Sequence, residues 1–180
     1  EELARFAMQH VIDDGAVAAV VLAARTHKRS PALLLSSLDA LCNMADDQDA
    51  LSTMVTEGAT ACVMDVLSNV SETSAELIQS SEVELLQRAL QLLAVLTECR
   101  AAVPMLTTIA GTRSLLTTMA IHSGIISGGA HAHFSEDTME LLLCAAVALE
   151  NAAFDPQGVQ ELQEAIVAVT VSGSSNEGSC

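Results

Sequence analysis

The sequence predicts an all-α fold built from stacked helical units. Hydrophobic residues make up 51% of the chain, but only three residues are aromatic, so the core must consist of small and aliphatic side chains at close helix–helix distances. Residues 36–67 show a long amphipathic helix, an acidic turn, a short helix, a glycine and a further helix, and this pattern recurs on both sides. The apolar face of one unit is too wide for the unit to cover alone, so the units are expected to stack.

Ten helices follow from the spacing of apolar residues and from start and stop signals. In chain order they cover residues 2–12, 16–26, 31–45, a short stretch ending at 56, 59–69, 81–98, 101–110, 112–122, 136–153 and 156–171. They group into units of about 1–45, 46–98 and 99–153, a capping helix at 156–171 and a mobile polar tail at 172–180.

Several helix starts are marked by capping residues. Ser30-Pro31 and Asp155-Pro156 each place an N-cap before a proline at the first helical position. Ser81 and Glu84 have the spacing of a capping box, and the acidic run at 46–49 supplies the cap of the short helix.

Glycines mark the boundary between the short helix of a unit and the helix that follows it. Gly15-Ala16 and Gly58-Ala59 are 43 residues apart, and we expect Gly111 to take the same position 53 residues further along. The longer second interval reflects an insertion at 70–80, and a second, glycine-rich insertion is expected at 125–134. Because loops vary without disturbing a stack, both insertions are candidates for partner-specific contacts.

Charge and cysteine usage restrict the class of protein. The formal charge is −16, so long-range repulsion opposes a nucleic-acid or anionic-membrane surface. The five cysteines form no C-x-x-C motif and are typical of small buried residues in a reducing compartment. No basic segment precedes a cleavable apolar stretch in this sequence, and no apolar run of about 18 residues or more occurs in it. We therefore expect a cytoplasmic protein without a membrane span, and a piece of a larger chain or complex because the chain begins partway into a unit.

Three-helix units with these features resemble armadillo repeats. Besides the glycines, the resemblance depends on an A-L-x-N-x-A signature late in the third helix, found at Ala40–Ala45 and Ala148–Ala153, whereas Val95 replaces the Asn in the second unit. The resemblance covers residues 1 to about 171. It implies a right-handed α-solenoid of about three to four armadillo-like repeats.

In the armadillo family the third helices line a concave groove, and the signature Asn commonly holds the backbone of an extended peptide. The resemblance therefore implies a groove formed by Ser36, Asp39, Asn43, Arg88, Gln91, Val95, Cys144, Val147 and Asn151. The chain has no Trp to sandwich lysine stems as nuclear-import receptors do, and Arg88 alone does not reproduce the basic groove of the β-catenin type. We expect a mixed, mildly acidic groove. Alternatively, Asn43 and Asn151 are only solvated or satisfy a neighbouring loop.

Three other site interpretations are less favoured. A metal site could combine His122, His131, His133 and Cys144, but their spacing matches no structural zinc signature. The basic run at 25–29 could dock a phosphate or an acidic partner, although cations at a helix C-terminus first of all complement the helix dipole, by at most about 1 kcal/mol. The acidic run at 46–49 lacks the following glycine and the distal Glu of a calcium loop.

No P-loop, G-x-S-x-G, H-E-x-x-H or dinucleotide glycine motif is present, so we expect no enzyme, no cofactor and no metal. The expected function is that of an adaptor or scaffold for protein–protein interaction, which binds an extended segment of a partner protein in the groove. The alternative is a structural component locked into a cytoskeletal or axonemal assembly through the convex face, the loops or the solenoid ends. A weaker alternative is a regulatory domain of a multidomain enzyme.

Overall fold

The computed structural model describes residues 15–71, 80–122, 136–154 and 156–174. Throughout these ranges the chain forms helices and short turns without any strand, which confirms the all-α class. The predicted helix at 2–12, most of the insertion at 70–80 and the insertion at 125–134 lie outside the described residues.

The helical boundaries agree closely with the predicted ones in the first half of the chain. The elements are α2 (Ala16–Thr26), α3 (Pro31–Met44), α4 (Gln48–Glu57), α5 (Ala59–Ser71), α6 (Ser80–Leu96), α7 (Val103–Leu106), α8 (Ile109–His122), α9 (Glu136–Ala153) and α10 (Pro156–Ser174). α6 begins one residue before the predicted capping box. α10 ends at Ser174, three residues beyond the predicted end of this helix.

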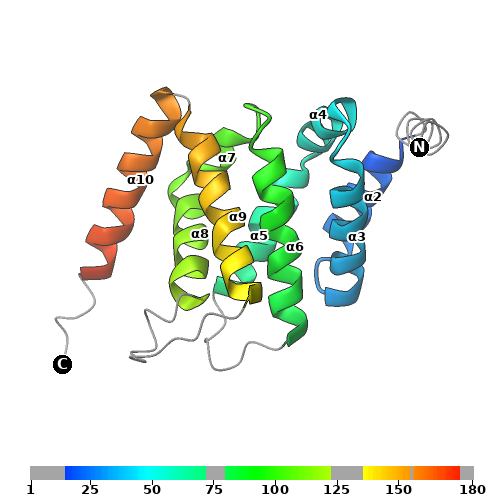
Figure 1. Cartoon of the computed structure of the whole chain (residues 1–180), viewed down its shortest axis with the longest axis horizontal. Helices are drawn as coiled ribbons and strands as arrows, with labels where there is room; N and C mark the ends of the chain where they lie inside the picture. Colours follow the sequence, from blue (N-terminus) through cyan, green and yellow to red (C-terminus); the bar gives the residue numbers. More distant parts are fainter. Residues whose placement is uncertain (1–14, 72–79, 123–135, 155, 175–180) are drawn as a thin grey trace.

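The helices form two layers (Figure 1). In one layer α3, α6 and α9 stand side by side, with α6 packed between the other two. In the other layer α5 packs between α2 and α8 and supports α6 from behind. α10 packs against α8 and α9, and the hydroxyl of Thr107 after α7 donates a hydrogen bond of 2.5 Å to the carboxylate of Glu161 on α10.

α6 contributes many aliphatic side chains to the core because α3, α5 and α9 all contact it. Each fully buried leucine contributes about 1.5–3 kcal/mol of hydrophobic free energy. The buried residues of α6 are Leu85, Leu86, Ala89, Leu90, Leu92, Leu93, Ala94 and Leu96.

The predicted caps around α4 are confirmed. The side-chain carboxylate of Asp47 accepts hydrogen bonds from the backbone nitrogens of Asp49, at 2.9 Å, and Ala50, at 3.0 Å. At the other end Gly58 adopts a left-handed conformation, with φ of 88°, as does Gly15 before α2, with φ of 82°. Only glycine takes up this conformation at little cost, so Gly58 fixes the direction in which the chain leaves α4 and enters α5, and Gly15 fixes the direction in which it enters α2.

The prediction that Gly111 separates two helices is wrong. α8 already begins at Ile109, and the predicted helix at 101–110 is reduced to the four residues of α7. Gly111 therefore lies in the first turn of α8, where its backbone nitrogen donates to the hydroxyl of Thr108 at 3.0 Å. A Cβ atom at position 111 would lie 2.5 Å from the carbonyl oxygen of Met105. Position 111 requires glycine because the backbone carbonyl oxygens of Met105 and Leu106 leave no room for a Cβ atom, and not because φ is positive.

Candidate functional site

The residues predicted to line a groove come from the three helices of one layer. None of the nine is fully buried, and all nine lie on α3, α6 and α9; we call the surface that they form the three-helix face. The face is defined by Ser36, Asp39 and Asn43 on α3, Arg88, Gln91 and Val95 on α6, and Cys144, Val147 and Asn151 on α9.

A chain of polar contacts crosses the three-helix face. Nε of Arg88 on α6 lies 2.8 Å from Oδ1 of Asp39 on α3. Nη1 of Arg88 donates to Oε1 of Gln91 at 2.9 Å, and Nε2 of Gln91 donates to Oε1 of Glu140 on α9 at 2.7 Å. We call these four residues the polar ladder. Glu140 was not predicted, although it lies one helical turn before the predicted Cys144 and could have been found from that spacing.

The polar ladder orients its side chains more than it stabilises the fold. The side chains of Asp39 and Arg88 are each 43% exposed, and an ion pair in water contributes only about 0.2–1 kcal/mol. Arg88 nevertheless has two internal partners, so its guanidinium is not a free cation for an acidic ligand. With two carboxylates and one guanidinium the ladder has a formal charge of −1, as expected for a mildly acidic surface.

The two signature asparagines have different environments. Nδ2 of Asn151 donates to the carbonyl oxygen of Ala94 at 3.1 Å and to the hydroxyl of Thr97 at 3.2 Å. The last carbonyl groups of a helix lack partners within the helix, so Asn151 serves the C-terminal end of α6. Asn43 is exposed and has no hydrogen-bond partner in the part of the chain that the structure describes. Its amide is free to hydrogen-bond to a partner.

The rest of the three-helix face is small or apolar. The hydroxyl of Ser36 is exposed but donates to the carbonyl oxygen of Ala32 on its own helix, at 3.0 Å. Val95 and Cys144 pack partly against the core, and Val147 is partly exposed. Val95, Cys144 and Val147 thus add small or apolar surface on α6 and α9.

The thiols at this surface are poor nucleophiles. Burial raises the pKa of the Cys42 thiol to about 11, although the nearby Arg88 acts in the opposite direction. Burial also raises the pKa of Cys144, and the Glu140 carboxylate adds to this effect. Both thiols are therefore neutral near pH 7, whereas nucleophilic and metal-binding cysteines react as thiolates.

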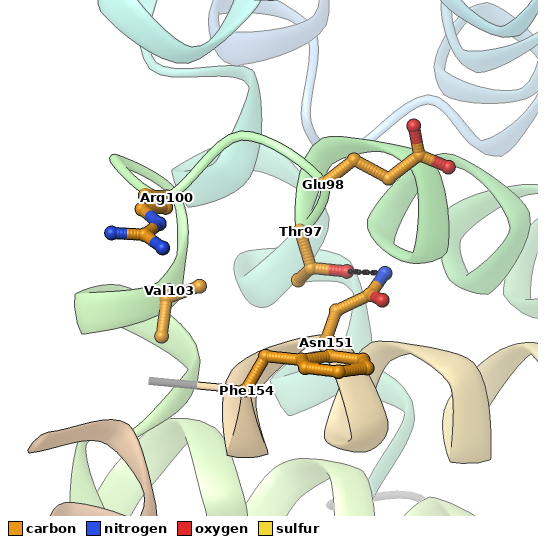
Figure 2. A pocket seen from close by; sticks show the side chains of 6 residues that line it. All are labelled: Thr97, Glu98, Arg100, Val103, Asn151 and Phe154. Carbon is orange, nitrogen blue, oxygen red and sulfur yellow. Dashed lines mark hydrogen bonds between the residues drawn. The ribbon is translucent and has the colours of Figure 1, made fainter. Parts of the chain in front are cut away.

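A pocket of about 220 Å³ lies where α6 and α9 end (Figure 2), and we call it the end pocket. It is lined by Thr97, Glu98, Arg100, Val103, Asn151 and Phe154. The ring of Phe154 is 78% exposed, and Arg100 is exposed as well. Arg100 and Phe154 were not predicted, although Phe154 directly follows the signature at Ala148–Ala153 and is one of only three aromatic residues.

The other predicted site interpretations gain nothing from the geometry. Within the described ranges no group of three or more His, Cys, Asp or Glu side chains is arranged to hold a metal, and His131 and His133 lie outside these ranges. In the acidic run, Asp47 caps α4. The side chains of Arg25, His27, Lys28 and Arg29 are exposed where α2 ends.

No protein-family model, no curated protein and no solved structure matches the chain. In the described part of the chain no single helix is long and apolar enough to cross a membrane. α4 and α5 together have sufficient length and apolar composition, but the chain bends by 63° between them.

Proposed function

We propose that the chain is a non-enzymatic interaction scaffold of the cytoplasm, an armadillo-type α-solenoid of about three to four repeats. It binds an extended segment of a partner protein along the three-helix face. The two-layer packing, the left-handed glycines at Gly15 and Gly58, and the signature asparagines support the armadillo assignment.

The polar ladder is the observation that carries this proposal. Its side chains come from three helices and are held in series on an exposed surface, so they lose little conformational freedom when a partner binds. The ordering cost then falls mainly on the partner segment. An exposed amide at Asn43 can bind the backbone of an extended segment, and the apolar surface at Val95 and Val147 can accept its side chains.

The proposal is tested by blocking the face without disturbing the fold. Ser36→Arg combined with Asn43→Arg adds two bulky charges to exposed positions of the three-helix face. The matched control, Ser52→Arg with Thr56→Arg, adds the same charges to exposed positions of α4. Both variants are compared with the wild type by quantitative affinity capture from a cell extract, after circular dichroism has confirmed folding.

We expect the face variant to lose partners that the wild type and the α4 control retain. Identical sets of captured proteins for all three would contradict binding at the three-helix face.

A second function, that of a structural component of a larger assembly, is favoured by the outer edge of α9. Met139 and Leu143 lie one turn apart and are 56% and 64% exposed. Within the layer, α6 packs against one side of α3, and α9 packs against the same side of α6. Among the described helices none covers Met139 and Leu143 on that side of α9. Such an edge fits a further helix in an extended array. A chain that stays monomeric at high concentration in sedimentation, with or without Leu143→Ser, would argue against this function.

A further inference from the structure

Arg100 is a cation that the fold itself does not use. Arg88, the other arginine near the three-helix face, is held by Asp39 and Gln91. Arg100 is the only Lys or Arg among the residues that line the end pocket, and it is exposed. Within the described ranges its guanidinium has neither an ion pair nor a hydrogen bond. All five donors of the group are therefore available to a ligand.

The walls of the end pocket differ in chemistry. Figure 2 shows Arg100 and Val103 on one side and Thr97 with Asn151 on the opposite side, with the ring of Phe154 below Asn151. The carboxylate of Glu98 points away from both Arg100 and Phe154. The interior of the pocket is thus positively charged on one wall and apolar below, in a chain whose net charge is −16.

Asn151 leaves one further group available. Its Nδ2 is engaged with the carbonyl oxygen of Ala94 and the hydroxyl of Thr97, which fixes the orientation of the amide. Its Oδ1 accepts no hydrogen bond from the described residues. This oxygen can accept a hydrogen bond from a backbone N–H group of a bound segment.

From these groups we infer that the end pocket binds the side-chain carboxylate of a glutamate in the partner segment. The planar guanidinium of Arg100 can hold a carboxylate through two parallel hydrogen bonds. The methylene groups of the glutamate pack against Val103 and Phe154, and its backbone N–H donates to Oδ1 of Asn151. Glutamate is preferred to aspartate because it has one more methylene group to pack against the apolar side chains of Val103 and Phe154.

This inference deepens the proposed function and rests on it, because it assigns one anchor residue to the segment bound along the three-helix face. At physiological salt, charges on the rest of the chain are screened beyond about 8 Å, so the local field of Arg100 governs the contact within the pocket. The anchor therefore selects one acidic residue, and it does not require an acidic partner as a whole.

The test is an NMR titration of the isotopically labelled 180-residue chain with small probes. N-acetyl-glutamate amide carries only the side-chain carboxylate, and N-acetyl-glutamine amide is its neutral isostere. N-acetyl-glutamine with a free α-carboxylate carries the charge of a chain terminus. We expect N-acetyl-glutamate amide to shift the Val103 methyl and Asn151 side-chain amide signals, with an affinity about tenfold higher than that of either glutamine probe.

Two variants locate the binding site. Arg100→Gln should weaken binding of N-acetyl-glutamate amide about tenfold, whereas Arg113→Gln, at an exposed position of α8 outside the pocket, should leave it unchanged. Equal binding of the neutral probe, or an unchanged affinity in Arg100→Gln, would overturn the inference. If the probe with the free α-carboxylate binds most tightly, the pocket recognises a chain terminus and not a glutamate side chain, and the glutamate assignment is overturned.

The titration and the capture experiment can fail independently. If the Ser36→Arg, Asn43→Arg variant loses partners but the glutamate probe does not bind, glutamate binding in the end pocket is rejected and partner binding along the three-helix face is retained. Binding of the probe without any loss of partners would reject the three-helix face.

Discussion

The amide nitrogen of Asn151 on α9 lies 3.1 Å from the carbonyl oxygen of Ala94 on α6, to which it donates a hydrogen bond. The hydroxyl of Thr97 donates to the same carbonyl at 2.8 Å and also accepts from Asn151. The three groups form a closed set of hydrogen bonds at the end of α6. At this position the signature asparagine joins two neighbouring helices, whereas Asn43 remains exposed.

Substitution of the two asparagines should therefore have unequal effects on stability. Asn151→Ala leaves the Ala94 carbonyl with one partner fewer, and we expect the free energy of unfolding to fall by about 1–2 kcal/mol. Asn43→Ala removes an exposed amide and should change it by less than about 0.5 kcal/mol. Urea denaturation followed by circular dichroism measures both. Equal effects of the two substitutions would contradict the different environments of the two amides.

The two glycines at Gly58 and Gly111 should respond differently to larger residues. Gly58→Ala is expected to cost about 1–2 kcal/mol because of the left-handed backbone, and Gly58→Asn less because Asn tolerates that conformation. Gly111→Ala should cost about 1–3 kcal/mol because its Cβ meets the carbonyl oxygens of Met105 and Leu106, and Gly111→Asn should be no better. Thermal unfolding of the four variants checks this, and a rescue by Asn at position 111 would refute the steric explanation.

The ion pair between Asp39 and Arg88 should show a small, salt-dependent coupling. In a double-mutant cycle with Asp39→Ala and Arg88→Ala we expect a coupling energy of about 0.5 kcal/mol, because both side chains are 43% exposed. In about 1 M NaCl the coupling should decrease further. A control cycle of Asp39→Ala with Glu150→Ala, an exposed position of α9, should show no coupling. A coupling unaffected by salt would mean that the pair is not held by electrostatics.

The raised pKa of Cys42 predicts a loss of stability at alkaline pH. Folding raises this pKa from 9.0 to about 11, so between these values the folded chain keeps a proton that the unfolded chain has lost. The stabilising effect is complete below pH 9.0 and is lost as the pH rises towards about 11. The difference in unfolding free energy between about pH 8 and about pH 10.5 should be smaller in Cys42→Ala than in the wild type. An equal change in unfolding free energy in both proteins would refute this effect. The pKa values of Cys62 and Cys144 are also raised, so these thiols account for any pH dependence that remains in Cys42→Ala.

Local signals were sufficient to predict much of the fold. The caps at Asp47, Gly15 and Gly58 act on neighbouring backbone groups, so α2, α4 and α5 were correctly placed. Gly111 was misinterpreted because the sequence does not distinguish a glycine with positive φ from one that allows a close backbone contact. In that case the deciding contact is with Met105, on the preceding turn.

The candidate site was only partly predictable, since its contacts join distant parts of the chain. Asn151 was recognised by its signature, but its partner Ala94 is 57 residues away, and the sequence alone could not decide between a ligand and a structural amide. Gln91 was predicted without its partner Glu140, 49 residues away. The end pocket was missed because its lining residues come from the C-terminal ends of α6 and α9 and from the segments that follow them, which lie together only when the two helices pack.

Site-specific photo-crosslinking tests the central claim most directly. A benzophenone amino acid is placed at Asn43 on the three-helix face, and in a control protein at Ser52 on α4, since both positions are exposed. After irradiation in a cell extract, we predict that position 43 is joined to a partner through one contiguous extended segment, and that position 52 is not. Crosslinks from position 52 alone, or the same crosslinks from both positions, would contradict binding along the three-helix face.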